Sequence, residues 1–77
     1  MTLEEAEIMT GAKWSVEERD EFPFEMVYYW LKWPDGTRHG AAMRKGFEDV
    51  GMVANAVVKW LGERHNASAR DEKNNGL

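Results

Sequence analysis

The segment Trp33-Pro34-Asp35-Gly36-Thr37 constrains the fold of this 77-residue chain more than any other feature. Proline presets the backbone at the first position of a turn, and glycine accepts the positive φ that closes it. The preceding stretch, Phe24 to Trp33, is rich in aromatic and β-branched residues, which favour a strand. A three-residue loop, Pro34 to Gly36, then predicts an antiparallel hairpin in which Trp33 lies opposite Thr37.

This register predicts two chemically different faces on the hairpin. The face that we expect against the core carries Val27, Tyr29, Leu31, Trp33, Ala41 and Met43, with His39 opposite Leu31. The other face pairs Lys32 with Arg38, Trp30 with Gly40, Tyr28 with Ala42 and Met26 with Arg44, and it also carries Phe24. Because the three cations Lys32, Arg38 and Arg44 favour water, the aromatic residues beside them should be partly exposed.

The N-terminal part predicts a short helix and then leaves two alternatives open. Thr2 and Glu5 have the spacing of a capping box, and Gly11 can end the helix that they begin. Next, apolar residues alternate with polar ones, as in a strand with one buried face; they are Ala12, Trp14 and Val16. Ser15 with Glu18 also fits a capping box, so residues 16–22 could instead form one or two helical turns before Pro23.

Residues 47–64 predict the main helix. Its apolar face comprises Phe47, Val50, Ala54, Val57, Val58 and Leu61, with Val53 and Trp60 at the shoulder, and Glu48 and Asp49 occupy the first turn. Residues 65–77 are small, polar and unpatterned, so we expect a flexible tail. The sequence therefore predicts a single α+β domain over residues 1–64, with a three-stranded antiparallel β-sheet, one long C-terminal helix packed on one face and a short N-terminal helix.

Composition narrows the possible functions. The chain has no cysteine, which excludes a disulfide framework, a thiolate metal site and a thiol nucleophile. Its length allows one small core, and the common catalytic and nucleotide-binding motifs are missing from the sequence. The longest apolar run, Met26 to Leu31, is too short to cross a bilayer. We expect a non-enzymatic protein without cofactor or metal, located in the cytoplasm of a bacterial host cell.

The charge is unevenly distributed along the chain. Fourteen acidic and ten basic residues give a formal charge of −4, but residues 1–25 carry −6 and residues 26–77 carry +2. The acidic candidates for partner binding are Glu17, Glu18, Asp20, Glu21 and Glu25. Together they could engage a basic surface on a protein or ribonucleoprotein complex, or they could simply keep an edge strand soluble.

A second candidate surface combines aromatic and basic residues. It comprises Tyr28, Trp30, Lys32, Arg38 and Arg44. Tyrosine, tryptophan and arginine dominate binding hot spots, so a protein partner is one possibility. Bases could stack on the aromatic rings while cations meet phosphates, although the acidic residues nearby make nucleic acid binding the weaker alternative. Two open faces could also stack in a homodimer, which would give these residues a structural role.

Two resemblances follow from these residues. The helix–sheet–helix order resembles the outline of a double-stranded-RNA-binding domain, but this chain has Phe47-Glu48-Asp49 where that family has a lysine cluster, and only Arg44 and Lys45 precede it. An acidic, cysteine-free, single-core protein with surface aromatics also resembles the small inhibitors of bacteriophages and mobile elements, of which anti-CRISPR proteins are one group. This resemblance implies steric blocking of a nucleic-acid-handling complex.

Overall fold

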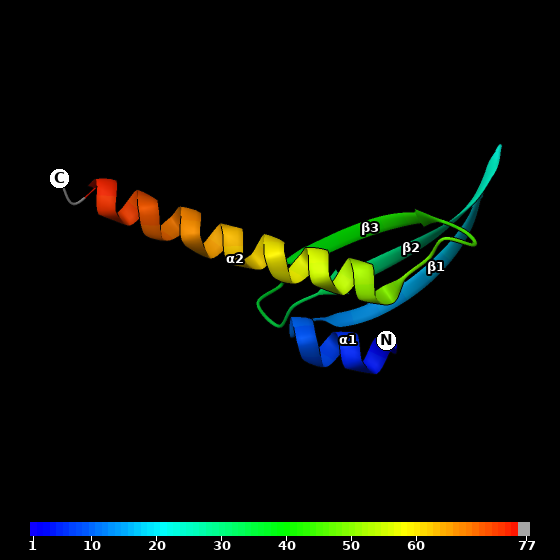
Figure 1. Ribbon diagram of the computed structural model, residues 1–77, viewed down its shortest axis with the longest axis horizontal. Helices are drawn as coiled ribbons and strands as arrows, with labels where there is room; N and C mark the ends of the chain where they lie inside the picture. Colours follow the sequence, from blue (N-terminus) through cyan, green and yellow to red (C-terminus); the bar gives the residue numbers. More distant parts are fainter. Residues whose placement is uncertain (76–77) are drawn as a thin grey trace.

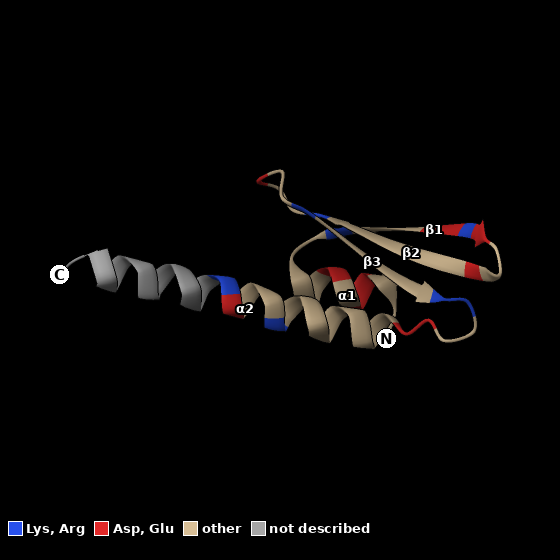
Figure 2. Ribbon diagram, turned by 90° about the horizontal axis from the view of Figure 1, so that it is seen from above, with Lys and Arg blue, Asp and Glu red and all other residues tan. Residues whose placement is uncertain are grey.

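Three strands and two helices make up the part of the chain that the structure describes. The computed structural model describes the backbone of residues 1–75 and the side chains of residues 1–64. The elements follow in the order α1 (Leu3–Thr10), β1 (Lys13–Glu21), β2 (Phe24–Lys32), β3 (Arg38–Arg44) and α2 (Val50–Asn75) (Figure 1). The strands form an antiparallel sheet in the order β1-β2-β3, and both helices lie on the same side of it (Figure 2). The predicted α+β class is confirmed.

The β2–β3 hairpin has the predicted register. Every expected pair from Met26 opposite Arg44 to Lys32 opposite Arg38 is present. The Trp33 amide donates to the Thr37 carbonyl at 2.9 Å, and the Gly36 amide donates to the Trp33 carbonyl at 3.0 Å. Gly36 has a φ of 91°, which explains why this turn requires glycine.

Residues 15–21 belong to the strand β1 and Phe22 to the turn that follows it, so the helical alternative for residues 16–22 is wrong. β1 pairs with β2 from Lys13 opposite Lys32 to Glu21 opposite Phe24, and a helix there would have left this edge of β2 without hydrogen-bond partners. Trp14 is buried, as predicted. Val16 was expected on the same buried face but is 45% exposed. Both residues lie on the edge strand β1, but the Trp14 indole bonds to Thr10 of α1, whereas no such contact covers Val16 among the described side chains.

The helix α2 begins at Val50, three residues later than predicted. The Asp49 carboxylate accepts a hydrogen bond from the Met52 amide at 3.1 Å, so Asp49 caps the helix and is not part of its first turn. Phe47 therefore lies outside the helix and is 69% exposed, and the expectation that it belongs to the core is wrong. Val58 is also exposed, whereas Val53 is fully part of the core.

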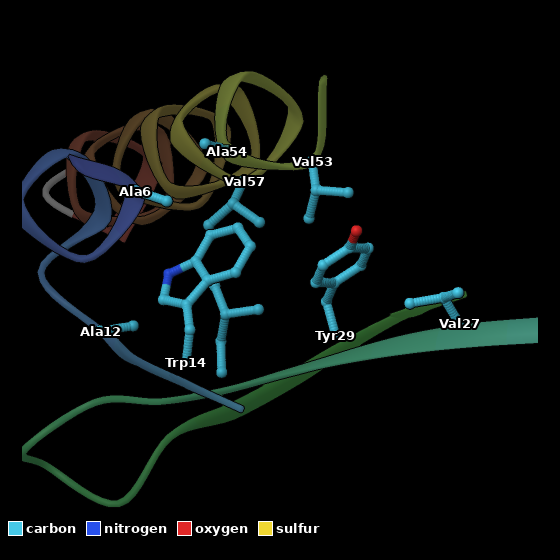
Figure 3. Close-up of a cluster of buried hydrophobic side chains, with 9 residues drawn as sticks. Ala6, Ala12, Trp14, Val27, Tyr29, Val53, Ala54 and Val57 are labelled. Atoms are coloured by element: carbon cyan, nitrogen blue, oxygen red, sulfur yellow. The ribbon is translucent and has the colours of Figure 1, made fainter. Parts of the chain in front are cut away.

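The core lies between the sheet and the two helices (Figure 3). Its buried residues are Ala6, Ala12, Trp14, Val27, Tyr29, Leu31, Val53, Ala54 and Val57. Leu31 and Val57 are its largest fully buried side chains. Ala6 and Ala54 leave no exposed surface where α1 and α2 pack together, because alanine lets two helices approach closely.

Thr10, at the end of α1, connects this helix to two tryptophans. Its hydroxyl donates to the Ala6 carbonyl at 2.7 Å and accepts from the Trp14 indole at 2.9 Å. Its carbonyl accepts from the Trp33 indole, also at 2.9 Å. The short helix is therefore fixed to the sheet by polar contacts as well as by packing. Its capping box and the φ of 72° at Gly11 confirm the predicted helix ends.

The helix α2 continues to Asn75, eleven residues beyond its predicted end at residue 64. The predicted flexibility of residues 65–77 is not tested by the backbone conformation and stays a prediction. Within the described residues, no helix is long and apolar enough to cross a membrane.

Candidate binding face

The face of the sheet opposite the helices is called the open face here, because no described element covers it (Figure 2). Alternate residues of each strand point to it, as strand geometry requires. It comprises Lys13, Ser15, Glu17, Arg19 and Glu21 from β1, Phe24, Met26, Tyr28, Trp30 and Lys32 from β2, and Arg38, Gly40, Ala42 and Arg44 from β3. Phe24 and Trp30 are 43% and 40% exposed, so the open face presents aromatic surface to solvent.

The aromatic pair, Tyr28 and Trp30, lies at the middle of the open face. The two rings are stacked, with centroids 5.8 Å apart and planes within 12° of each other. Trp30 lies against Gly40, where the Cβ of any larger residue would come within 2.6 Å of the indole Cζ3 atom. The predicted packing of Trp30 over Gly40 is therefore confirmed, and it requires a residue without a side chain at position 40.

Three side chains from β1 hold this pair in place. The Arg19 guanidinium carbon lies 4.8 Å from the Tyr28 ring centroid and 6.0 Å from that of Trp30. Glu17 accepts from Arg19 Nε at 2.8 Å and from the Trp30 indole at 3.0 Å. The Tyr28 hydroxyl donates to Glu21. Both aromatic polar groups therefore have fixed partners, and Arg19 is held over the rings by a bidentate contact with Glu17.

These contacts change the acidity of the groups that make them. The pKa of Glu17 is lowered, first by its hydrogen bond with Arg19 and then by the one with Trp30. The pKa of Arg19 is raised by the same carboxylate. The pKa of Tyr28 is raised chiefly by its hydrogen bond to Glu21. At neutral pH the cluster therefore keeps an ionised Glu17 and a neutral Tyr28.

The far end of the open face carries a second group of exposed aromatic residues. The Arg44 guanidinium carbon lies 4.1 Å from the Phe24 ring centroid and 5.9 Å from that of Phe47. Phe22, in the two-residue turn between β1 and β2, is fully exposed. Exposed aromatic residues therefore lie at this end of the sheet as well as in the aromatic pair.

The structure does not bring the five predicted acidic residues together. Glu17 and Glu21 lie on the open face, whereas Glu18, Asp20 and Glu25 point to the opposite side of the sheet. Lys45 lies 3.8 Å from Glu18 and 3.7 Å from Glu25 there. Consecutive residues of a strand alternate between its faces, so these five acidic residues could form a single surface only if the segment were not a strand.

The predicted cations Lys32, Arg38 and Arg44 do share the open face. The sequence analysis missed Lys13 and Arg19, which join them because β1 is a strand throughout. Five cations and two carboxylates give this face a formal charge of +3, although the whole chain carries −4. The alternation of residues 12–16 contained this signal for Lys13, which stands between Ala12 and Trp14. Residues 17–21 are all charged, so no alternation in the sequence could have assigned Arg19 to a face.

His39 lies away from the open face, against the Trp60 ring, with centroids 4.7 Å apart. His65 lies outside the residues with described side chains. Among the side chains that the structure describes, no three histidine, aspartate or glutamate residues gather as metal ligands would. Comparison of the chain with protein-family models, with curated proteins and with solved structures gave no match.

Proposed function

We propose that this protein is a small non-enzymatic binding module that docks its open face on a protein partner. The observation that carries the proposal is the aromatic pair held between Gly40 and Arg19. Tryptophan, tyrosine and arginine are the side chains most often found at binding hot spots. Because their hydrogen bonds to Glu17 and Glu21 already fix these rings, binding would lose little further side-chain entropy.

The biological role that we propose is inhibition by occlusion. A module of this size can cover a surface that its target needs, as the anti-CRISPR proteins of phages and mobile elements do to nucleic-acid-handling complexes. The resemblance in size, composition and architecture supports this class, and a bacterial cytoplasm is the matching location. The partner would be such a protein or ribonucleoprotein complex.

Nucleic acid binding is the second candidate, and the charge of the open face favours it. Five cations beside two aromatic rings are the composition of a sheet that binds single strands. Against it, Arg19 already lies over the Tyr28 ring, and Glu17 and Glu21 stand among the cations, where they would repel phosphates.

Capture from bacterial lysate tests both candidates. The immobilised full chain is compared with Trp30→Ala and with Met52→Ala, which removes an exposed apolar side chain from α2 instead. Each capture is run with and without nuclease, and retained proteins are identified by mass spectrometry. We expect a nuclease-resistant protein that the wild type and Met52→Ala retain and Trp30→Ala loses.

The other outcomes decide against the proposal. If all retained material disappears after nuclease treatment, the open face binds nucleic acid. If Trp30→Ala captures as much as the wild type, the open face is not the docking surface. If nothing is retained and Trp30→Ala converts a dimer to a monomer on sizing, the aromatic pair serves self-association.

A further inference from the structure

Four cations of the open face have no carboxylate partner within the described residues. Arg19 is paired with Glu17, but no salt bridge is formed by Lys13, Lys32, Arg38 or Arg44 in this part of the chain. Lys13, Lys32 and Arg38 lie at the same end of the sheet, because Lys32 pairs with both of the others across the strands. Three positive charges on adjacent strands repel one another, so this end favours an anionic occupant.

These three cations border a hollow next to the aromatic pair. The hollow has a volume of about 930 Å³ and is lined from both sides of this end of the sheet. Its open-face side comprises Lys13, Ser15, Trp30, Lys32 and Arg38, and its helix side includes Trp14, Leu31, Trp33 and Glu7. The Glu7 carboxylate there already accepts from the Trp14 amide at 3.2 Å. Trp30 supplies an apolar wall beside the charges, and Ser15 supplies a hydroxyl. An occupant that is both acidic and partly apolar would meet all of these groups.

We infer that the open face recognises an acidic polypeptide segment of its partner, which places carboxylates against Lys13, Lys32 and Arg38 and an apolar side chain against Trp30. This inference rests on the proposed docking function and reverses the polarity that the acidic residues of the sequence suggested. Glu17 and Glu21, the only acidic residues of that run on this face, are already occupied by Arg19, Trp30 and Tyr28.

The geometry favours a polypeptide over a nucleic acid as the anionic occupant. One side of the Trp30 indole rests on Gly40, and Arg19 lies over the Tyr28 ring, so a base would have to displace Arg19 to stack. A polypeptide can instead direct single carboxylates to the cations and avoid Glu17 and Glu21. The acidic remainder of the molecule, with an excess of seven negative charges outside the open face, would repel a phosphate backbone more than a locally acidic loop.

Amide chemical-shift mapping of the full ¹⁵N-labelled chain tests this inference. The probes are poly-L-glutamate, poly-L-lysine and single-stranded oligodeoxythymidine, each titrated at the same ionic strength. We expect poly-L-glutamate to shift the amides of Ser15, Gly40 and Ala42 and the Trp30 indole, but not the amides of Met52 and Lys59 on α2. Poly-L-lysine should leave the open face unchanged.

Charge reversals on and off the open face give the quantitative arm. Lys32→Glu combined with Arg38→Glu should weaken poly-L-glutamate binding by about tenfold or more, because two attractive charges become repulsive. Lys59→Glu, on the exposed side of α2, should change the affinity for poly-L-glutamate less than about twofold, since this charge lies outside the binding surface. Spectral dispersion of each variant shows that it is folded.

Every other pattern overturns the inference. Tighter binding of oligodeoxythymidine at the same amides would assign the face to nucleic acid, and binding of poly-L-lysine at those amides would restore a basic partner. If poly-L-glutamate shifts amides outside the open face, or if no probe shifts any amide, the three cations do not recognise an acidic segment. If a lysate partner requires Trp30 but ignores the Lys32→Glu and Arg38→Glu reversal, the polarity is wrong while the docking proposal stands.

Discussion

Single residues decide how the open face is arranged, and Gly40 is the clearest case. Replacing it with alanine would place a Cβ 2.6 Å from Trp30 Cζ3, so the indole must move off the sheet and away from Glu17. We expect Gly40→Ala to cost about 1 kcal/mol, the scale of one cross-strand contact, and to shift the Trp30 indole resonance strongly. Gly62→Ala, where nothing lies within 4 Å, should instead stabilise α2 by up to about 1 kcal/mol. Equal effects of the two substitutions would contradict this account.

Thr10 gives a second prediction at the residue scale. Thr10→Val keeps the shape of the side chain but leaves the buried Trp14 indole without its acceptor. We expect a loss of about 1–3 kcal/mol in the free energy of unfolding, measured by chemical denaturation. Thr10→Ser retains the hydroxyl and should lose clearly less. Equal losses in both variants would show that the methyl group, and not the hydrogen bond, matters here.

The titration of Glu17 makes the aromatic pair sensitive to acid. Its contacts with Arg19 and Trp30 lower its pKa below the ordinary value of 4.5 in the folded state. They therefore stabilise the fold fully above that value, and the contribution disappears as the pH falls through the lower folded pKa. We expect the Trp30 indole resonance to move in acid with a midpoint below pH 4.5. Glu17→Gln should abolish this transition, and a midpoint above 4.5 in the wild type would contradict it.

At the scale of elements, the start of α2 depends on Asp49. Its carboxylate accepts from the Met52 amide, one of the amides that a helix N-terminus leaves unpaired. We expect Asp49→Ala to reduce the free energy of unfolding by about 0.5–2 kcal/mol, measured by thermal denaturation followed by circular dichroism. Asp49→Asn keeps an oxygen acceptor and should remain close to wild type. A fully destabilised asparagine variant would point to charge instead of capping.

The elements also show what the sequence could and could not predict. The hairpin register was predictable because Pro34 and Gly36 restrict the turn locally, and the turn then determines every pair along both strands. The start of α2 was not predictable from the sequence, since Glu48 and Asp49 suit both the first turn of a helix and its N-cap. Only the geometry of the preceding turn at Gly46 distinguishes these two positions.

The candidate site was predictable only in part, for a related reason. The predicted hairpin register placed Tyr28, Trp30 and the three cations of the hairpin on the correct face. The acidic residues were treated as a run because the conformation of residues 15–22 was undecided between strand and helix. Once β1 is a strand, alternation separates Glu17 and Glu21 from Glu18 and Asp20. The contacts of Thr10 with two tryptophans carry no local signal and depend on tertiary packing.

For the whole molecule, one small core holds all five elements together. Leu31 lies at its centre and is 2% exposed. Leu31→Ala should cost about 2–5 kcal/mol, which is comparable to the entire stability of a domain of this size. We expect the helix signal in circular dichroism and the tryptophan fluorescence to be lost together in this variant. Helices that persist after the fluorescence has changed would contradict a single cooperative core.

The five consecutive charged residues Glu17 to Glu21 also affect how readily the protein aggregates through its sheet edge. They occupy β1, one of the two edge strands of the sheet, whose free backbone groups could otherwise accept a strand from a neighbouring chain. A strand added there would bring its side chains against charges on both faces, because alternation directs some of them to each side. The residues that do not form one docking surface thus protect the β1 edge of the sheet from strand addition, whereas the β3 edge carries formal charges only at its two ends, Arg38 and Arg44.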